Sequence, residues 1–403
     1  MRNRHIERIW LAQSFVDDLV LAYPVYAIMM LEHGVGAFEL TVLFVIWSAS
    51  ALVFEIPSGV LGDLLDRRRY ALVGSLIRAC GFLLWLVWPS FPGFAAGFVL
   101  WSMGSAIHSG TLQALLYDVL AEQGRTQAFA RIYGRGRALG SAGVLTAMAI
   151  GGYVAETGYT AVLLLSALAP AVSGALIVGL ISEPARTHAQ TGAAEPAFTA
   201  TLNAAVRALR TNRALARVSV MFVGLVALFG TIDEFPGTLL AEQGVMSLGT
   251  IGLLYGAFLG AQSLGSALAH RLHAVKLGRI AVVSAFAHCL LLGALAAGAW
   301  LAWPQAGVLL CTGVCLYFGI MGAVEVLLET GLQHEIDVGA RATITSFSGA
   351  AMEVCGILLY LVIGAVADIG SWSAALAVVA AIAIVLSVGF VYSAGPSALR
   401  SRS

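Results

Sequence analysis

Long apolar runs separated by short polar segments follow one another along almost the whole chain. A helix that crosses the hydrocarbon core of a bilayer needs about 20 mostly apolar residues. Because backbone polar groups in a bilayer must be satisfied within their own segment, we expect each run of this length to be an α-helix. The sequence therefore predicts an all-α membrane protein with twelve transmembrane helices. They lie at approximately residues 9–31, 41–62, 70–89, 93–118, 132–155, 159–181, 215–240, 248–270, 278–299, 304–330, 343–366 and 372–392.

The composition agrees with a chain whose surface faces lipid. Of its 403 residues, 59% are hydrophobic and 11% are charged, whereas soluble proteins carry about 25% charged residues. The formal net charge is zero, which gives no reason to expect a nucleic-acid partner. The sequence offers no metal-ligand spacing, nucleotide-binding loop or Ser/His/Asp set. We therefore expect no enzyme, no cofactor and no metal site.

Basic residues occur at alternate connections between the predicted helices, which sets the orientation of the chain. The connection after each even-numbered helix is basic, and so are both termini, whereas the six other connections contain no Arg or Lys. This is the positive-inside pattern, so we expect a multi-pass protein of the cell inner membrane with both termini in the cytoplasm. The basic positions are Arg2, Arg4, Arg8, Arg67, Arg68, Arg69, Arg125, Arg131, Arg186, Arg207, Arg210, Arg213, Arg271, Lys276, Arg279, Arg341, Arg400 and Arg402.

A long polar segment divides the twelve predicted helices into two sets of six. It covers residues 182–213, so we expect an N-terminal bundle over 1–181, a cytoplasmic linker, and a C-terminal bundle over 214–403. The second part of the linker has apolar residues at helical spacing, which fits either an amphipathic helix on the inner membrane surface or a flexible linker. A shift of 212 positions aligns the two halves, with Pro24 on Pro236 and Gly158 on Gly370. The halves are therefore parallel repeats.

The connection after the second predicted helix carries a motif made of Gly59, Asp63, Arg67 and Arg68. Glycine, three residues, aspartate and a basic pair resemble the loop signature of the major facilitator superfamily. Leu64 stands where that signature commonly has a basic residue, and Asp66 where it has glycine. With the six-plus-six layout, the resemblance covers the whole chain. It implies the major facilitator fold and secondary active transport of a small molecule across the lipid bilayer, and we expect a monomer.

The resemblance also implies a gate at the cytoplasmic end of the first bundle. In the superfamily such a cluster locks the two halves together when the cytoplasmic side is closed. We expect Gly59 to allow close helix contact, and Arg67 and Arg68 to reach acids on neighbouring helix ends. Asp118, at the inner end of the fourth predicted helix, is the expected partner. The arginines could instead serve only to orient the chain in the membrane.

Ionisable residues within the predicted helices are costly, so they are candidates for function. Protons are the expected coupling ion, and the candidate carriers are Asp17, Asp18, Glu55, Glu325 and Glu353. Adjacent helical residues point about 100° apart, so Asp17 and Asp18 cannot both face a cavity. We expect Asp17 to face the cavity and Asp18 to pair with Arg78.

The balance of intramembrane charge is acidic, which favours a cationic, zwitterionic or neutral amphipathic substrate over an anionic one. The resemblance implies that helices one, four, seven and ten line the cavity. Its candidate residues are Gln13, Tyr23, His108, Asp233 and Tyr317.

The fifth and eighth predicted helices carry regularly spaced glycines. The fifth ends in Gly151-Gly152, as in proton-linked drug exporters of the superfamily, but lacks their proline. The leading hypothesis is proton-coupled efflux; alternatives are proton-linked uptake of a nutrient and, more remotely, a membrane-embedded sensor or enzyme. The resemblance also implies that helices five and eight pack together through Gly136, Gly140 and Gly143 on one and Gly252, Gly256 and Gly260 on the other.

Overall fold

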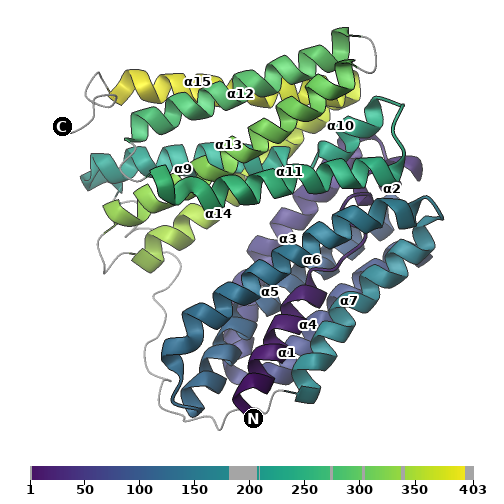
Figure 1. Ribbon diagram of the computed structural model, residues 1–403, viewed down its shortest axis with the longest axis vertical. Coiled ribbons are helices and arrows are strands. Elements are labelled where there is room, and N and C mark those ends of the chain that lie inside the picture. The colour runs from purple at the N-terminus through teal and green to yellow at the C-terminus, as the bar shows by residue number, and fades with distance from the viewer. Residues whose placement is uncertain are drawn as a thin grey trace. The chain divides into compact units, whose positions relative to one another are not determined.

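The computed structural model describes residues 2–180, 207, 209–272, 276–301, 305–336 and 341–394 (Figure 1). Internal contacts divide the chain into two compact units. The first comprises Met1–Thr191 with Gly244–Gly256, and the second comprises Gly192–Gln243 with Ala257–Ser403. The linker predicted over 182–213 lies almost entirely outside the described residues, so both interpretations of its second part stay predictions.

The first unit is built from helices that pack lengthwise on one another. Helix α4 lies against both α5 and α7, α1 lies against α6 and α7, and α3 packs on α5. The elements are α1 (Arg2–Asp17), α2 (Tyr26–Glu32), α3 (Ala37–Leu64), α4 (Arg67–Val87), α5 (Phe91–Glu122), the short 3-10 helix η1 (Thr126–Ala128), α6 (Phe129–Ala155), α7 (Tyr159–Leu180) and the first turns of α11 (Leu248–Leu268).

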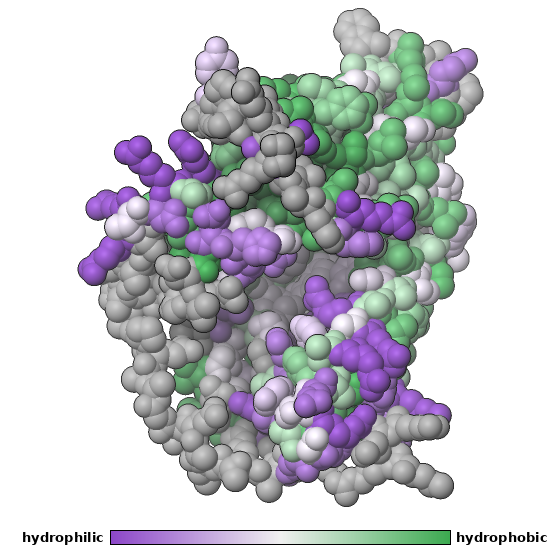
Figure 2. Space-filling model, turned by 60° about the vertical axis from the view of Figure 1, so that its left-hand side comes forward, coloured by the Kyte–Doolittle hydropathy of each residue, from purple (hydrophilic) through white to green (hydrophobic). Residues whose placement is uncertain are grey.

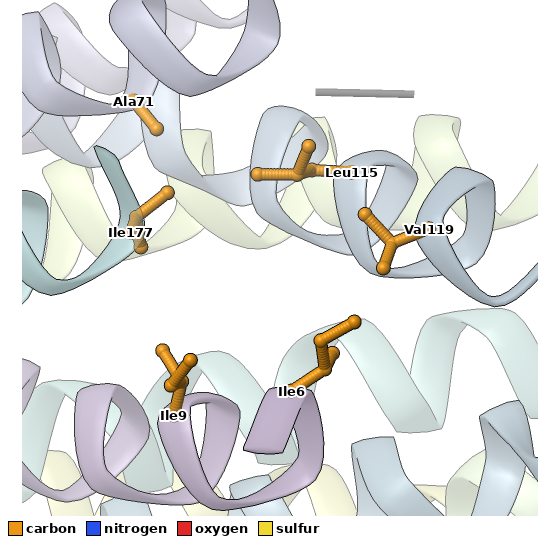
Figure 3. Close-up of a cluster of buried hydrophobic side chains, with 6 residues drawn as sticks. All are labelled: Ile6, Ile9, Ala71, Leu115, Val119 and Ile177. Carbon is orange, nitrogen blue, oxygen red and sulfur yellow. The ribbon is translucent and has the colours of Figure 1, made fainter. Parts of the chain in front are cut away.

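Buried aliphatic side chains anchor α1 to its neighbours. Ile6 and Ile9 of α1 face Leu115 and Val119 of α5, with Ala71 of α4 and Ile177 of α7 completing the cluster (Figure 3). Since all six side chains are buried, this apolar contact fixes the position of α1 on the rest of the first unit.

The second unit is also helical in its described residues. Helix α12 packs on α13 and α15, and α9 contacts α13, α14 and α15. Phe229, Phe258, Tyr317 and Phe318 are fully buried in its core. Besides the rest of α11, the elements are α9 (Arg213–Ile232), α10 (Pro236–Glu242), the 3-10 helix η2 (Ala269–Leu272), α12 (Leu277–Trp300), α13 (Gln305–Glu335), α14 (Arg341–Ile369) and α15 (Trp372–Ala394).

Within the described residues, ten helices are long and apolar enough to cross a membrane. The run predicted at 93–118 is the 32-residue helix α5, which is not among the ten, and the run predicted at 9–31 is divided between α1 and α2. A total of twelve spans therefore stays a prediction. The hydrophobic surface on the right-hand side of Figure 2 is what a lipid-facing exterior requires.

The division of the first span has a local cause. Residues 18–25 are not helical, and Pro24 within them has no amide hydrogen and would clash with a carbonyl one turn earlier in a continuous helix. The amide of Ala22 instead donates to Ser166 Oγ of α7 at 2.9 Å. In the second unit α9 ends at Ile232 and α10 begins at Pro236. Of the two prolines that the repeat aligned, Pro24 therefore lies within a break and Pro236 lies directly after one.

The sequence predicted that Gly136, Gly140 and Gly143 of α6 face α11, but all three face α1 and the turn that follows it. A Cβ atom on Gly140 would lie 2.5 Å from Asp18 Oδ2, and Gly136 and Gly143 approach α1 in the same way. These three positions share one face of the helix, and that face is occupied by α1. On the α11 side, Gly256 does approach α6, but through Met148 and not through these glycines. A Cβ atom added to Gly256 would lie 3.2 Å from the Met148 Cβ atom.

Ser166→Ala should destabilise the protein because it leaves the buried amide of Ala22 without its acceptor. We expect a loss of about 1–3 kcal/mol in the free energy of unfolding, measured by denaturant titration in detergent. Ser387→Ala is the matched control, since Ser387 is equally buried but its hydroxyl has no hydrogen-bond partner among the described residues. Equal effects of the two variants would contradict this role of Ser166.

Candidate functional site

A buried ion pair lies where α1 ends. Arg78 Nη1, from the middle of α4, donates to Asp17 Oδ2 at 2.7 Å, and Nη2 donates to the Asp17 carbonyl oxygen at 3.4 Å. Only 5% of the Arg78 surface is exposed. A cation is favoured at the C-terminal end of a helix, where carbonyl groups lack partners within the helix. Arg78 therefore neutralises the carboxylate and also caps the end of α1.

The sequence had assigned the two aspartates the other way round. Asp17 forms the pair with Arg78, whereas the Asp18 carboxylate lies against Gly140 of α6. The prediction assumed that the helix continues through both residues, but α1 ends at Asp17 and Asp18 belongs to a turn. The angle expected between adjacent helical residues therefore does not apply.

His108 of α5 also lies close to the Asp17 carboxylate. Its Nδ1 is 3.7 Å from Asp17 Oδ2. Its Nε2 is 2.9 Å from both the Ala71 carbonyl oxygen and Ser75 Oγ, which belong to α4. Three helices thus bring an arginine, a carboxylate and an imidazole together inside the first unit.

Two glycines provide the space for this cluster. A Cβ atom on Gly104 would lie 2.5 Å from Arg78 Cγ, and one on Gly74 would lie 2.9 Å from His108 Cδ2. Without side chains at these positions, α4 and α5 approach closely enough for the arginine and the imidazole to fit between their backbones.

Nearby polar and aromatic side chains extend the site along α1 and α5. Gln13 Nε2 donates to Ser173 Oγ of α7 at 3.2 Å. The ring of Tyr23 stacks on that of Trp101, with centroids 5.8 Å apart. Trp47 of α3 packs on the same Trp101 at 5.7 Å. The interrupted part of span one therefore lies beside an aromatic group.

The residues predicted to line a cavity are not equally accessible in this structure. Gln13 and His108 are buried in the first unit, and Tyr317 is fully buried in the second. Tyr23 and Asp233 are half-buried, and Asp233 lies at the end of α9. A role in lining a cavity stays a prediction for all five residues.

The other candidate acids belong to other helices. Glu55 is exposed on α3. Glu325 on α13 and Glu353 on α14 are half-buried in the second unit. Among the described residues, no group of three His, Cys, Asp or Glu side chains could hold a metal ion.

The motif after α3 forms the ion pair that the sequence predicted. Arg67 Nη1 bonds to Asp118 Oδ2, linking the start of α4 to the end of α5. Asp66, a departure from the superfamily pattern, accepts the amide of Arg69 at 2.9 Å and so caps α4. The side chain of Asp63 lies outside the described atoms. The gating role of this pair stays a prediction.

The close helix contact expected at Gly59 occurs instead at Gly62. Among the described residues, no atom lies within 4 Å of a Cβ built on Gly59, whereas one on Gly62 would lie 3.0 Å from Thr111 Oγ1 of α5. Gly62 is three residues further along α3, on the face that meets α5. The part that Gly59 plays in the gate stays a prediction.

Sequence reasoning missed the serines that support the site. Ser75 contacts His108, Ser166 accepts the amide of Ala22, and Ser173 accepts from Gln13. A signal was present, because Ser166 and Ser173 are the serines of an otherwise apolar helix and stand seven residues apart on one face.

Fold and site together define a multi-pass helical membrane protein with a charge cluster buried in one helical unit. The sequence profile of the Major Facilitator Superfamily matches residues 14–335, and the chain belongs to this superfamily. It is therefore a transporter of the secondary class, as the resemblance of its motif implied.

Solved structures agree on the fold. The nucleoside transporter NupG has a TM-score of 0.80 at 14% identity, with 96% of this chain and 99% of that chain covered. A bacterial homologue of the human lysosomal transporter Spinster gives 0.75 at 11% identity, covering 100% and 99%. A bacterial homologue of the iron transporter ferroportin gives 0.66 at 15%, covering 96% and 97%. No curated protein matches the sequence.

Asp17→Asn should destabilise the protein by about 3–5 kcal/mol, because it leaves the buried Arg78 charge uncompensated. Adding Arg78→Gln should recover most of this loss, since two neutral amides can hydrogen-bond to each other. Denaturant titration of both single variants and the double variant gives the coupling between the two positions. Asp18→Asn is the control and should have a much smaller effect; a larger effect at Asp18 would contradict the observed pairing.

Proposed function

We propose that this protein is a proton-coupled exporter of a small amphipathic compound, working by alternating access in the cell inner membrane. The observation that carries the proposal is the Arg78–Asp17 pair, buried beside His108 at the interrupted end of α1. Buried charges in a membrane segment are expensive, and they are retained mainly where they bind ions or substrates.

The cluster has the composition that proton coupling needs. Arg78 keeps its charge at all relevant pH values, whereas Asp17, Asp18 and His108 can gain and lose protons. A proton that reaches the cluster changes which groups are paired at the end of α1. Because α1 is not a continuous helix, its two parts can move separately, so protonation can favour one conformation over another.

The charges of the site favour a cationic, zwitterionic or neutral substrate. Arg78 is already paired with Asp17, so its charge is not available to an anionic compound. The half-buried residues Asp233, Glu325 and Glu353 place further carboxyl groups in the second unit, and none of these three can carry a positive charge. Tyr23 and Trp47 offer half-buried aromatic surface to an amphipathic molecule. The similar structures carry names of nucleoside, lysosomal and iron transporters, so they do not select one substrate.

Everted membrane vesicles test both the coupling and its direction. An acidic interior should drive accumulation of at least one compound from a panel of cationic, zwitterionic and neutral fluorescent dyes. The stable double variant Asp17→Asn with Arg78→Gln should lose this accumulation, because it lacks the titratable pair.

Glu7→Gln is the matched acid control, since Glu7 pairs with an exposed arginine, Arg135, at the surface. Accumulation that requires an acidic exterior would indicate uptake rather than efflux. Transport of a dye that is insensitive to the pH gradient would contradict proton coupling.

We further propose that Arg67 and Asp118 act with Gly59, Asp63 and Arg68 as a cytoplasmic gate. The ion pair joins the ends of α4 and α5 directly beside the apolar cluster that contains Leu115 and Val119. Breaking it removes a contact that holds this end of the bundle closed.

Arg67→Gln should therefore expose the apolar cluster behind the pair. A cysteine introduced at Leu115, which is 1% exposed, should react faster with a membrane-impermeant maleimide in a background without the five native cysteines. Asp118→Asn should act in the same direction, and Arg135→Gln, which breaks the more exposed pair with Glu7, should not. Unchanged labelling and transport in both gate variants would remove the assignment.

A further inference from the structure

The position of one proton on His108 is set by its neighbours. The ring is buried, with 6% of the residue exposed. Its Nε2 lies 2.9 Å from the carbonyl oxygen of Ala71. A carbonyl oxygen only accepts hydrogen bonds, so Nε2 must carry a hydrogen, and the Ser75 hydroxyl at 2.9 Å can rotate to suit it.

The other ring nitrogen then faces a carboxylate without a proton between them. In the neutral imidazole, Nδ1 has only a lone pair, and it lies 3.7 Å from Asp17 Oδ2. Neither His108 Nδ1 nor Asp17 Oδ1 has a hydrogen-bond partner among the described residues, and both are buried. Two acceptors that face each other in a buried site repel, and one added proton would convert the repulsion into a charge-assisted hydrogen bond.

The formal charges around His108 also indicate that the site can take up one proton. When Asp17 and Asp18 are both ionised, they contribute two negative charges from the α1 segment against the one positive charge of Arg78 in α4. In that state the cluster is one proton short of neutrality. Tyr23 is neutral. Arg137 acts on Asp18 from α6 but is exposed, so solvent and lipid headgroups screen its charge. Glu55 of α3 is exposed and outside the cluster.

We propose that His108 and Asp17 bind one proton jointly, between Nδ1 and Oδ2, and that this shared proton is the one exchanged during transport. The proposal rests on the proposed function of the same site and adds His108 to it as a proton-binding residue. When the proton binds, the cluster gains one positive charge, and when the proton leaves, the cluster loses that charge.

The geometry also connects proton binding to the interrupted helix. Arg78 Nη1 and His108 Nδ1 lie 2.7 Å and 3.7 Å from the same oxygen, Asp17 Oδ2. A protonated His108 therefore competes with Arg78 for this oxygen and weakens the hold of Arg78 on the end of α1. Release of the proton returns the carboxylate to Arg78.

The second unit provides a control with the same residue type and the same burial. His288 of α12 is fully buried, but Nδ1 lies 2.8 Å from the Ser284 carbonyl oxygen and Nε2 lies 3.2 Å from the Tyr317 hydroxyl. The carbonyl accepts from Nδ1–H and the hydroxyl donates to Nε2, so the neutral ring is already satisfied. His288 has no reason to take up a proton.

Potentiometric titration of the detergent-purified protein tests the proposal without any substrate. Between about pH 8 and pH 5, where imidazoles titrate, His108→Gln should take up about one proton fewer than the wild type. Asp17→Asn should also lose about one, because the proton needs both partners. The double variant His108→Gln with Asp17→Asn should lose about one proton as well, not two. The control variant His288→Gln should match the wild type.

Several outcomes would overturn the shared site. Undiminished proton uptake in His108→Gln would exclude His108, and a loss confined to Asp18→Asn would move the proton to that residue. Additive losses in the double variant would show two independent sites. His108→Asn is a second variant in case His108→Gln fails to fold, which elution volume and thermal unfolding would reveal.

The titration also separates this inference from the proposed function. A shared proton in a protein whose transport ignores the pH gradient would contradict coupled export while leaving the binding site intact. Proton-driven transport that persists in His108→Gln would contradict the role of His108 while leaving coupled export intact.

Discussion

The ion pair between Arg78 and Asp17 is the interaction on which the first unit depends. A guanidinium with 5% exposure cannot remain charged in an apolar bundle without a close anionic partner. Its position fixes several other features. Gly104 must lack a side chain so that the arginine fits, and α1 must end at Asp17 so that its carbonyl is available. His108 lies close to the same carboxylate oxygen that Arg78 binds.

The break in span one creates a second demand, because backbone groups at membrane depth need partners. Ser166 supplies one by accepting the amide of Ala22, and the bare glycines of α6 let its backbone approach α1 and the turn that follows. The second unit is interrupted before the proline that the repeat aligns with Pro24. A repeated interruption suits a transporter of the Major Facilitator Superfamily, since it places irregular backbone inside the bundle at a position where charged side chains can gather.

Much of the fold followed from the sequence. Apolar runs of about 20 residues predicted the helices, because the thickness of a bilayer sets their length. The charge pattern and the aligned prolines predicted the layout, and the motif predicted the pair between Arg67 and Asp118. The glycine contacts were not predictable in the same way. A helix has several faces, and the sequence of α6 does not say which face meets α1 and which meets α11.

The sequence by itself determined the class of the protein, the order of its helices and the inventory of buried ionisable residues, because hydropathy and charge are properties of segments. Only the tertiary structure decided which of these residues meet. It paired Asp17 rather than Asp18 with Arg78, since α1 ends at Asp17, and it placed His108 beside the same carboxylate. Pairing depends on distances of a few ångströms between three helices, and a one-residue change in where a helix ends redirects a side chain completely.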